Sequence, residues 1–346
     1  MGVEIFPTVY LSRPAVVLPP QRIENDELLA RVREHYRGPA KDLRVIESIV
    51  KRTFAQCGSQ CRYLEPDPTV RVADYAARAS QACLDAGGVA ATDVDLLING
   101  SIAREYFEPS TAMEIAARLG IERIHAFDVT SACAGQLEAV HVACAYLNLY
   151  PQMQTALICA AELTRQFLTY DIQSVEELVA KVAGLTIGNA AAAWLVRRKP
   201  FPGGCLRLLA MANYSLPQNW HLCHAPIDGT FTSISGELFK LNVHVAPELQ
   251  RMLDRLGWTH EDVDHFVFHQ PSEKMIKKVL QDLGADPRKA VYTHHLFGNT
   301  SSTTVALAMN QLLQEREVRH GQKLILSTAA SGFTMVTAAG EWVDER

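Results

Sequence analysis

The stretch DVDLLINGS, residues 93–101, forms a short polar lead into a buried strand, and DVDHFVFHQ repeats its pattern at residues 262–270. A second pair of apolar strands keeps the same order, with TALICAAEL at residues 155–163 and KLILSTAAS at residues 323–331. The members of each pair are about 168 residues apart, and chance matches between short apolar runs do not often keep one constant offset. The chain is therefore predicted to consist of two similar halves.

Each half alternates strands with helices, which indicates an α/β protein. The strands are nearly unbroken apolar runs, as is typical of sheets that are covered on both faces. Between the two strands of each pair, a turn of small residues precedes a helix, expected at residues 134–150 and 301–314. Both helices are apolar on nearly every face, so we expect them to lie centrally, between sheets. The predicted architecture is a five-layered α-β-α-β-α core.

Length and composition agree with a large double unit. The chain has 346 residues, of which 48% are hydrophobic and 21% charged, a balance that fits a globular protein. The segment RRKPFPGG, residues 197–204, combines charge with two prolines and two glycines and is the expected seam. We therefore divide the chain into an N-terminal half, residues 1–197, and a C-terminal half, residues 198–346.

Charge and hydropathy argue against several classes of protein. A net charge of −5 without any basic block argues against general nucleic-acid binding, although a local basic patch for an acidic carrier or a phosphate stays open. The first residues, MGVEIFPTVYLS, show no basic stretch followed by an apolar one, so no secretory signal is expected. The longest uncharged run, residues 182–196, is too short to span a membrane. We expect a cytoplasmic protein with no membrane span.

The eight cysteines show no spacing typical of a disulfide framework. Two short clusters, residues 57–61 and 221–224, look like fragments of metal sites, but each lacks a matching pair of ligands. No metal site is expected, and most of the thiols are interpreted as small buried hydrophobic groups.

Three residues at the ends of strands or helices are candidates for chemistry. Cys133 precedes the first central helix, where unpaired N–H groups and the helix dipole favour a thiolate, the nucleophile of acyl transfer; the alternative is a buried cysteine in a helix cap. His269 follows a strand at the sheet edge where ligands collect, and a histidine alone there more often only caps the strand. Asn299 opens the second central helix, where a helix cap or a left-handed turn is the alternative. The duplication would bring all three to one cavity.

The segments around these residues resemble the three active-site blocks of β-ketoacyl-acyl-carrier-protein synthase III, within the thiolase superfamily. They are DVTSACAGQLEA (128–139), FVFHQPSEKMI (266–276) and HLFGNTSSTTVALAM (295–309). The segments LTIGNAAAAWLV (185–196) and STAASGFTM (327–335) resemble further blocks, so the similarity extends from about residue 3 to residue 343. The resemblance implies a thiolase fold, a homodimer, and no cofactor besides the acyl thioester substrate.

The same resemblance implies a role for each candidate. Cys133 would accept an acyl group from acyl-coenzyme A or an acyl carrier protein. His269 and Asn299 would hydrogen-bond the thioester carbonyl of a second substrate and stabilise its enolate, while the backbone N–H groups of Cys133 and Gly332 would bind the tetrahedral oxyanion. The implied reaction is a Claisen condensation of the acyl-enzyme with a second acyl or malonyl thioester, in lipid or secondary-metabolite biosynthesis.

Glu108, within NGSIAREYFEPSTA (99–112), departs from the housekeeping synthases, which usually have an apolar residue there. A glutamate at this place is similar to OleA-type thiolases, which join two long acyl thioesters head to head, and to related α-pyrone synthases. In that subgroup the glutamate reaches across the dimer and removes an α-proton, a role suited to a carboxylate whose pKa is raised in a dry cavity. An exposed glutamate, or one paired with Arg104, is the alternative.

The binding site for coenzyme A or a carrier arm is less well marked. The tryptophan that usually stacks on adenine has no counterpart in CGSQCRYLEP (57–66), which leaves Arg62 and Lys274 as candidate phosphate contacts, or else as ordinary solvated charges. The long polar and aromatic segment 213–236 is interpreted as a lid, a tunnel wall or a plain surface loop.

Two other functions remain open. One is acyl transfer to an oxygen or nitrogen acceptor without formation of a carbon–carbon bond, which needs no enolate and therefore no His269 and Asn299 pair. The other is a non-catalytic partner subunit of a heterodimer, a class that usually loses the cysteine or the histidine and asparagine, all of which this chain keeps.

Overall fold

The computed structural model of the chain describes residues 3–165, 167–227 and 229–344. Its main sheet has the strand order β12-β13-β14-β9-β1-β8-β7-β5-β6, with β2 paired to β8 beside this path. β1 joins the two parts because it pairs antiparallel with both β9 and β8. The strands of this sheet are β1 (Glu4–Leu11), β2 (Ala15–Val17), β5 (Leu96–Asn99), β6 (His125–Asp128), β7 (Thr155–Glu162), β8 (Ala190–Arg197), β9 (Cys205–Ser215), β12 (His265–Phe268), β13 (Lys323–Ala330) and β14 (Thr334–Val343).

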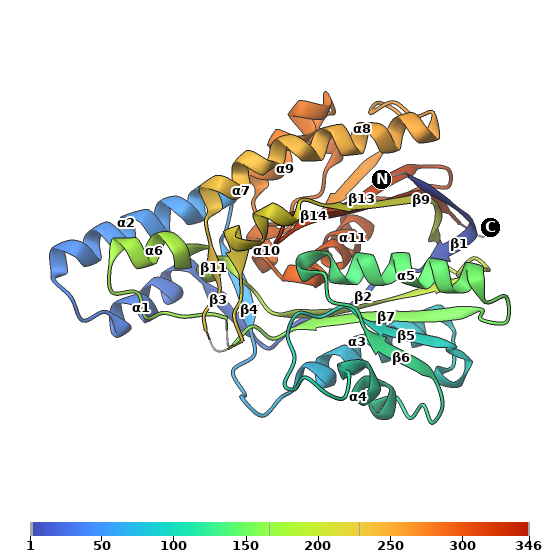
Figure 1. Cartoon of the computed structure of the whole chain (residues 1–346), viewed down its shortest axis with the longest axis horizontal. Coiled ribbons are helices and arrows are strands. Elements are labelled where there is room, and N and C mark those ends of the chain that lie inside the picture. The colour runs from blue at the N-terminus through green and yellow to red at the C-terminus, as the bar shows by residue number, and fades with distance from the viewer. Residues whose placement is uncertain (1–2, 166, 228, 345–346) are drawn as a thin grey trace.

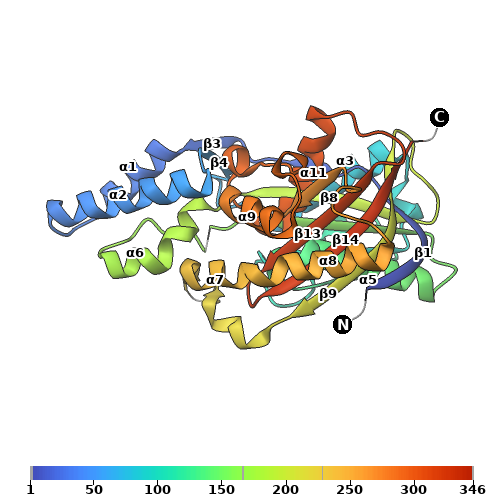
Figure 2. The same ribbon diagram turned by 90° about the horizontal axis from the view of Figure 1, so that it is seen from above.

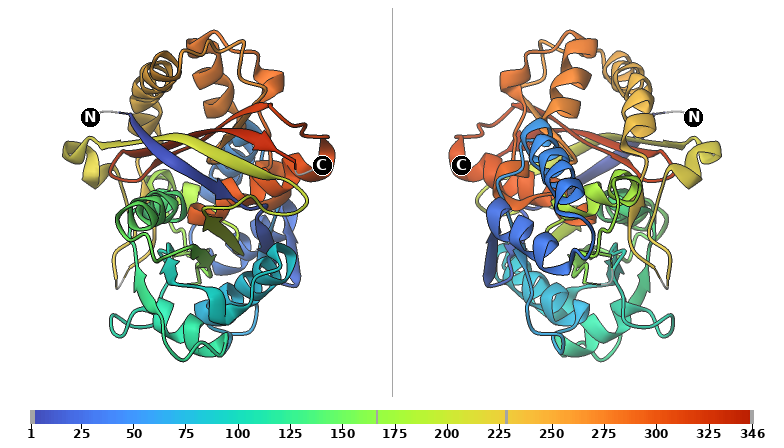
Figure 3. Two further views of the ribbon diagram at one scale, coloured as in Figure 1. Left: turned by 90° about the vertical axis from the view of Figure 1, so that its right-hand side faces the viewer. Right: turned by 90° about the vertical axis from the view of Figure 1, so that its left-hand side faces the viewer.

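Helices cover both outer faces of the sheet and fill the space between its two parts (Figures 1 and 3). Side chains of α5 and α11 form one core with inward-facing residues of β5, β7, β8, β9 and β12–β14. The opposite faces of the two parts pack against α3 and α4 and against α8 and α9. These helices are α3 (Val72–Gly87), α4 (Thr111–Arg118), α5 (Gly135–Leu149), α8 (Val245–Leu256), α9 (Glu273–Leu283) and α11 (Thr304–Glu315). The predicted five-layered core is confirmed.

Burial of both faces of the sheet explains why its strands are unbroken apolar runs. In β5, Leu96 and Ile98 face the central helices whereas Leu97 faces α3 and α4. Successive side chains of a strand point to opposite faces, so a strand covered on both sides needs an apolar residue at every position. The corresponding strand β12 repeats the arrangement with Val267 inward and Phe266 and Phe268 outward.

The duplication is also visible in the turns that precede the central helices. Short 3-10 turns, Ala132–Ala134 and Ser301–Thr303, lead into α5 and α11, and the first residue of each turn has a positive φ, 47° and 53°. The expected seam at residues 197–204 lies between the end of β8 and the start of β9. The division of the chain into residues 1–197 and 198–346 stays a prediction.

A group of helices and a small sheet stand at one end of the layered core and were not predicted from the sequence (Figures 1 and 2). Residues from all of these helices, among them Leu28, Ile46, Phe54 and Leu178, form a separate apolar cluster, which we call the cap. Its elements are α1 (Asn25–His35), α2 (Ala40–Cys57), α6 (Val175–Lys181), β3 (Gln21–Glu24) and β4 (Cys61–Leu64).

The segment 213–236 continues from β9 through a 3-10 turn, Pro217–Leu222, into the hairpin of β10 (Cys223–His224) and β11 (Thr232–Ser233), and ends at the start of α7 (Ser235–Leu241). The remaining short helix is α10 (His294–Phe297). Within the described ranges, no helix has both the length and the apolar character needed to cross a membrane.

Candidate active site

A cavity of about 650 Å³ lies at the N-terminal ends of the two central helices. Cys133, His269 and Asn299 all line it, so the structure brings together three residues that are far apart in the sequence. Its size is within the range of small-molecule sites, roughly 300–1,000 Å³. Residues of the segment 213–236, including Cys223, Phe231 and Ser233, also line the cavity, which favours the tunnel-wall interpretation of that segment.

Cys133 lies in the turn that opens α5, directly after Ala132 with its positive φ. The side chain is partly exposed, and Sγ accepts a hydrogen bond from Ser301 Oγ at 3.6 Å. Burial raises the pKa of this thiol to about 12, an effect that the Ser301 hydroxyl opposes and nearby Cys223 and Glu162 reinforce. The sequence led us to expect a lowered pKa at this helix end; burial instead raises the pKa, so the resting thiol is neutral.

His269 follows β12, and its backbone N–H donates to the carbonyl oxygen of Ser327 at 2.9 Å, which extends the pairing of β12 with β13 by one residue. The side chain is 6% exposed. Burial, with a smaller contribution from His294, lowers the pKa of His269 to about 3. The imidazole is therefore neutral in the physiological range, with one N–H to donate and one nitrogen to accept.

Asn299 is fixed by contacts with the other half of the chain. Its N–H donates to Thr186 O at 2.8 Å, its carbonyl oxygen accepts from Gly188 N at 3.0 Å, and its Oδ1 accepts from Ser301 N at 3.0 Å. Within the described residues no hydrogen bond uses Nδ2, which leaves this donor for a ligand. Gly298 makes the approach possible: its φ is 68°, and a Cβ there would lie 2.5 Å from Thr186 O.

Three residues other than glycine have a positive φ in the described part of the chain, and all three line this cavity: Ala132, Ser301 and Phe333. Such conformations cost about 1–3 kcal/mol each and tend to cluster at functional sites. Gly332, with φ 72°, lies between the cavity-lining residues Ser331 and Phe333, a place from which its N–H could serve an oxyanion. The oxyanion hole formed by Cys133 and Gly332 stays a prediction.

Glu162, at the end of β7, is a cavity residue that the sequence analysis missed. The side chain is fully buried, and burial raises its pKa. Its carboxylate accepts from Ile102 N at 3.0 Å, from Ala103 N at 3.1 Å and from the Ser302 hydroxyl. The signal in the sequence was a single acidic residue at the end of a wholly apolar strand, since buried carboxylates are rare unless they are paired.

The C-terminal part of the chain, residues 253–342, matches the family model described as 3-oxoacyl-(acyl-carrier-protein) synthase III C terminal. The β-ketoacyl-acyl-carrier-protein synthase III of Neisseria meningitidis serogroup C is 27% identical over 328 residues, 93% of this chain and 96% of that protein. The synthase III of Rhodospirillum centenum is 28% identical over 308 residues, 86% of this chain and 92% of that protein. The chain is thus similar to β-ketoacyl-acyl-carrier-protein synthase III enzymes along most of its length.

Solved structures show the same fold. An OleA variant from Xanthomonas campestris, with a glutamate replaced by alanine, superposes with a TM-score of 0.87 at 24% identity, covering 98% of this chain and 99% of that one. The synthase FabH from Pseudomonas aeruginosa PAO1 gives 0.81 at 22% identity, covering 98% of this chain and all of that one. These structures establish the fold, whereas the synthase III relatives indicate an acyl-transferring, condensing enzyme of fatty acid or lipid biosynthesis.

Glu108 does not line the cavity of its own chain in this enzyme. It is exposed, next to Phe107, whose side chain is 72% exposed. Arg104, which the sequence offered as its ion-pair partner, instead donates to Thr130 Oγ1 at 2.8 Å. A role for Glu108 as a base therefore requires a second copy of the chain, as the resemblance to OleA-type enzymes implies, and it stays a prediction.

The prediction that Arg62 contacts the phosphates of the substrate is wrong in this structure. The side chain is fully buried in the cap, where Nη2 donates to Asn25 Oδ1 at 2.9 Å and to Ser59 Oγ at 2.6 Å. Its guanidinium lies 5.1 Å from the ring centre of Phe54, and burial lowers its pKa to about 10. Lys274, by contrast, lines the cavity, and its phosphate contact stays a prediction.

Proposed function

We propose that this enzyme transfers an acyl group from acyl-coenzyme A or an acyl carrier protein to Cys133 and condenses it with a second acyl or malonyl thioester. The product is a β-ketoacyl compound. The observation that carries this proposal is the convergence of Cys133, His269 and Asn299 on one cavity with strained backbone on its wall. A site for simple acyl transfer would need only the first of these residues.

In the loading step, Cys133 Sγ attacks the thioester carbonyl and forms a new carbon–sulfur bond. The thiol proton passes to the leaving thiol as the old carbon–sulfur bond breaks. Because the resting thiol is neutral, the proton must leave as the attack proceeds, and the proposed donors at Cys133 N and Gly332 N stabilise the oxyanion. Holding the first acyl group on the enzyme makes the second step effectively unimolecular.

In the condensation step, neutral His269 and Nδ2 of Asn299 donate to the thioester oxygen of the second substrate. An enolate forms there when an α-proton passes to a base or carbon dioxide is lost, and its carbon attacks the acyl carbonyl on Cys133. The new carbon–carbon bond forms, the bond between the acyl carbon and Cys133 Sγ breaks, and the released thiolate takes up a proton to restore the resting thiol. Each such donor commonly contributes about 2.7–4 kcal/mol to the stability of the transition state. A histidine with a pKa of about 3 is a weak base, so His269 acts here as a donor.

For substrates that lose an α-proton, we propose that the enzyme is a homodimer and that Glu108 of the partner subunit is the base. The exposure of Glu108 and its neighbour Phe107 supports this arrangement, because neither side chain forms a hydrogen bond or ion pair with the residues that the structure describes. The chain also shares its fold with OleA, of which a solved variant has a glutamate replaced by alanine.

Intact-protein mass spectrometry after incubation with a panel of acyl-coenzyme A thioesters tests the loading step. The wild-type chain should gain one acyl mass and Cys133→Ala none. Cys223→Ala is the matched control, because Cys223 lines the same cavity and should not be the acceptor. Acylation of Cys133→Ala would overturn the proposal, and analysis of the products for a new carbon–carbon bond, with and without malonyl thioesters, separates condensation from transfer to oxygen or nitrogen.

A further inference from the structure

The loop between β5 and α4, residues 100–110, carries Glu108 near its outer end, and we call it the arm. Its inner end is tied to the cavity wall, because Glu162 accepts hydrogen bonds from Ile102 N and Ala103 N. At its outer end the chain enters α4, where Thr111 N donates to the carboxylate of Asp128 at 2.9 Å. The arm is thus anchored on both sides of Glu108.

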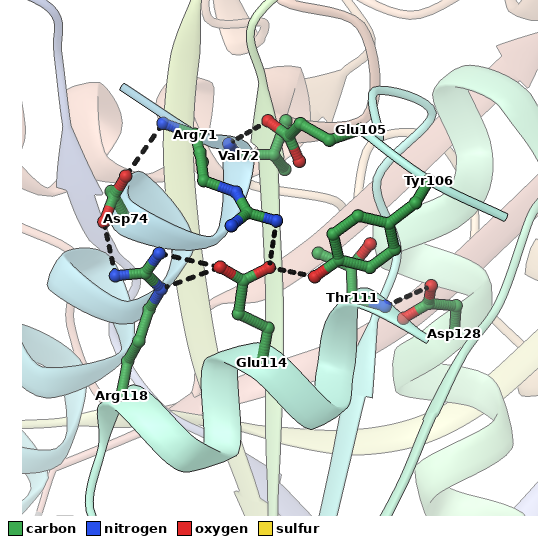
Figure 4. Close-up of polar contacts among 9 residues, drawn as sticks. All are labelled: Arg71, Val72, Asp74, Glu105, Tyr106, Thr111, Glu114, Arg118 and Asp128. Carbon is green, nitrogen blue, oxygen red and sulfur yellow. Dashed lines mark hydrogen bonds and ion pairs between the residues drawn. The ribbon is translucent and has the colours of Figure 1, made fainter. Parts of the chain in front are cut away.

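Two further ties hold the middle of the arm against α3 and α4 (Figure 4). Glu105 Oε1 accepts from Val72 N at 2.7 Å, and the Tyr106 hydroxyl donates to the carboxylate of Glu114. Among the described residues, Tyr106 is the last hydrogen-bonded side chain before Glu108, two positions away, and the first anchored group after it is the carbonyl oxygen of Ser110, which accepts from Met113 N at 3.1 Å. The three residues between these anchors form a short tip that carries Glu108.

The surroundings of Glu114 strengthen its hydrogen bond with Tyr106. Its side chain is 16% exposed, and its two oxygens also meet Arg71 Nη2 at 3.1 Å and Arg118 Nη2 at 2.7 Å (Figure 4). Burial raises its pKa, but the hydrogen bonds from Tyr106 and Arg118 outweigh burial and the net shift is downward. The carboxylate is thus ionised at neutral pH, and a hydrogen bond to an ionised acceptor is stronger than one between neutral groups. Arg71 also lies over the Tyr106 ring, 5.2 Å from its centre.

We propose that Tyr106 and Glu114 are positioning residues for Glu108, which they hold in place for the cavity of a second copy of the chain. The inference rests on the proposed function, in which Glu108 removes the α-proton of the second substrate. Proton abstraction requires the base within hydrogen-bond reach of the carbon, and a displacement of about 1 Å can slow such a step about a hundredfold. Neither residue lines the cavity, so neither acts on the substrate directly.

The test is Tyr106→Phe, which removes one hydroxyl, with Tyr292→Phe as the matched control. Tyr292 is also half-buried and donates its hydroxyl to a backbone oxygen, Pro287 O at 2.9 Å, away from the cavity. In Tyr106→Phe, kcat for condensation of two acyl thioesters should fall about tenfold, the loss expected for one charge-assisted hydrogen bond, with KM unchanged. Loading of Cys133 should stay at the wild-type rate in both variants.

The primary deuterium isotope effect of an α-deuterated second substrate distinguishes positioning from a general loss of stability. It should increase in Tyr106→Phe and stay at the wild-type value in Tyr292→Phe, because only the former slows proton abstraction. In a Glu108→Gln background, Tyr106→Phe should have no further effect on kcat. Equal kcat and isotope effect in the two tyrosine variants would overturn the inference while leaving the base intact, whereas full condensation by Glu108→Gln would overturn the base itself.

Discussion

Replacing Ser301 by alanine should slow the reaction of the Cys133 thiol, because Ser301 Oγ is the hydroxyl that donates to Cys133 Sγ. A hydrogen bond to the sulfur stabilises the thiolate more than the thiol, so its removal raises a thiol pKa that burial already places at about 12. Only the thiolate attacks an electrophile. At a fixed pH below that pKa, the variant should therefore react more slowly than the wild type.

The magnitude follows from the geometry of the contact. Hydrogen bonds to a charged partner contribute about 1.5–3 kcal/mol. The separation of 3.6 Å is long, and the thiol is partly exposed, so we take the lower end of this range. A change of about 1.4 kcal/mol corresponds to about one pKa unit and hence to a reaction about ten times slower.

The assay is the rate of alkylation by iodoacetamide, followed by intact mass between pH 6 and 9.5. The logarithm of the wild-type rate should rise by one for each pH unit without a plateau, and Ser301→Ala should run parallel and about tenfold lower. Ser301→Gly removes the same hydroxyl, and glycine adopts the positive φ of this position without strain. It should therefore slow alkylation as much as Ser301→Ala does, while the two variants should change the free energy of unfolding in opposite directions. Ser215→Ala, which breaks a contact with Thr334 between two residues that do not line the cavity, is the control. Wild-type rates in both Ser301 variants, or a plateau below pH 8.5, would refute the reasoning.

Three further predictions concern groups described above. His269 is protonated below about pH 6.5 in the unfolded chain but only near pH 3 in the folded chain, so protonation favours the unfolded state as the pH falls. When the pH is lowered from 7.5 to 5.5, the free energy of unfolding measured with urea should therefore fall by about 1.4 kcal/mol more in the wild type than in His269→Asn. Arg62→Met should lower the free energy of unfolding by about 2–3 kcal/mol and leave KM for acyl-coenzyme A unchanged; a raised KM without loss of stability would restore the phosphate contact. Gly298→Ala should reduce kcat for condensation about a hundredfold while sparing acyl loading, because a Cβ against Thr186 O displaces Asn299; unchanged kcat would show that the backbone there is free to move.

The duplicated core could be predicted because its signals are local. An apolar run of four to eight residues is typical of a strand covered on both faces, and the constant offset between the paired runs predicted the duplication. The same reasoning placed Cys133, His269 and Asn299 at helix and strand ends that the pseudo-symmetry brings together. The cap could not be predicted in this way, since its helices have no counterpart in the other half and no motif of their own.

The sequence did not indicate which charged side chains are buried. Arg62 and Lys274 are both single basic residues in polar surroundings of the sequence, yet one is fully buried and the other lines the cavity. The pKa of the Cys133 thiol was misjudged for a related reason: a helix end is a local feature, whereas desolvation is set by residues from both halves of the chain. Glu162 shows that such a group can be suspected from its isolation at the end of an apolar strand, but its three donors come from distant segments.

The contacts between the halves explain how the site keeps its strained geometry. Asn299, from the C-terminal half, is held by Thr186 and Gly188 of the N-terminal half, while Glu162 of the N-terminal half accepts from Ser302 at the start of α11. Each half therefore positions groups that the other half contributes, and backbone strain persists only where the surroundings over-determine a conformation. Because Glu162 also holds the inner end of the arm, a single buried carboxylate connects the arm that carries Glu108 with the turn that follows Asn299. In the proposed homodimer, this one contact would therefore affect both the placement of Asn299 in its own cavity and the placement of the base that enters the partner's cavity.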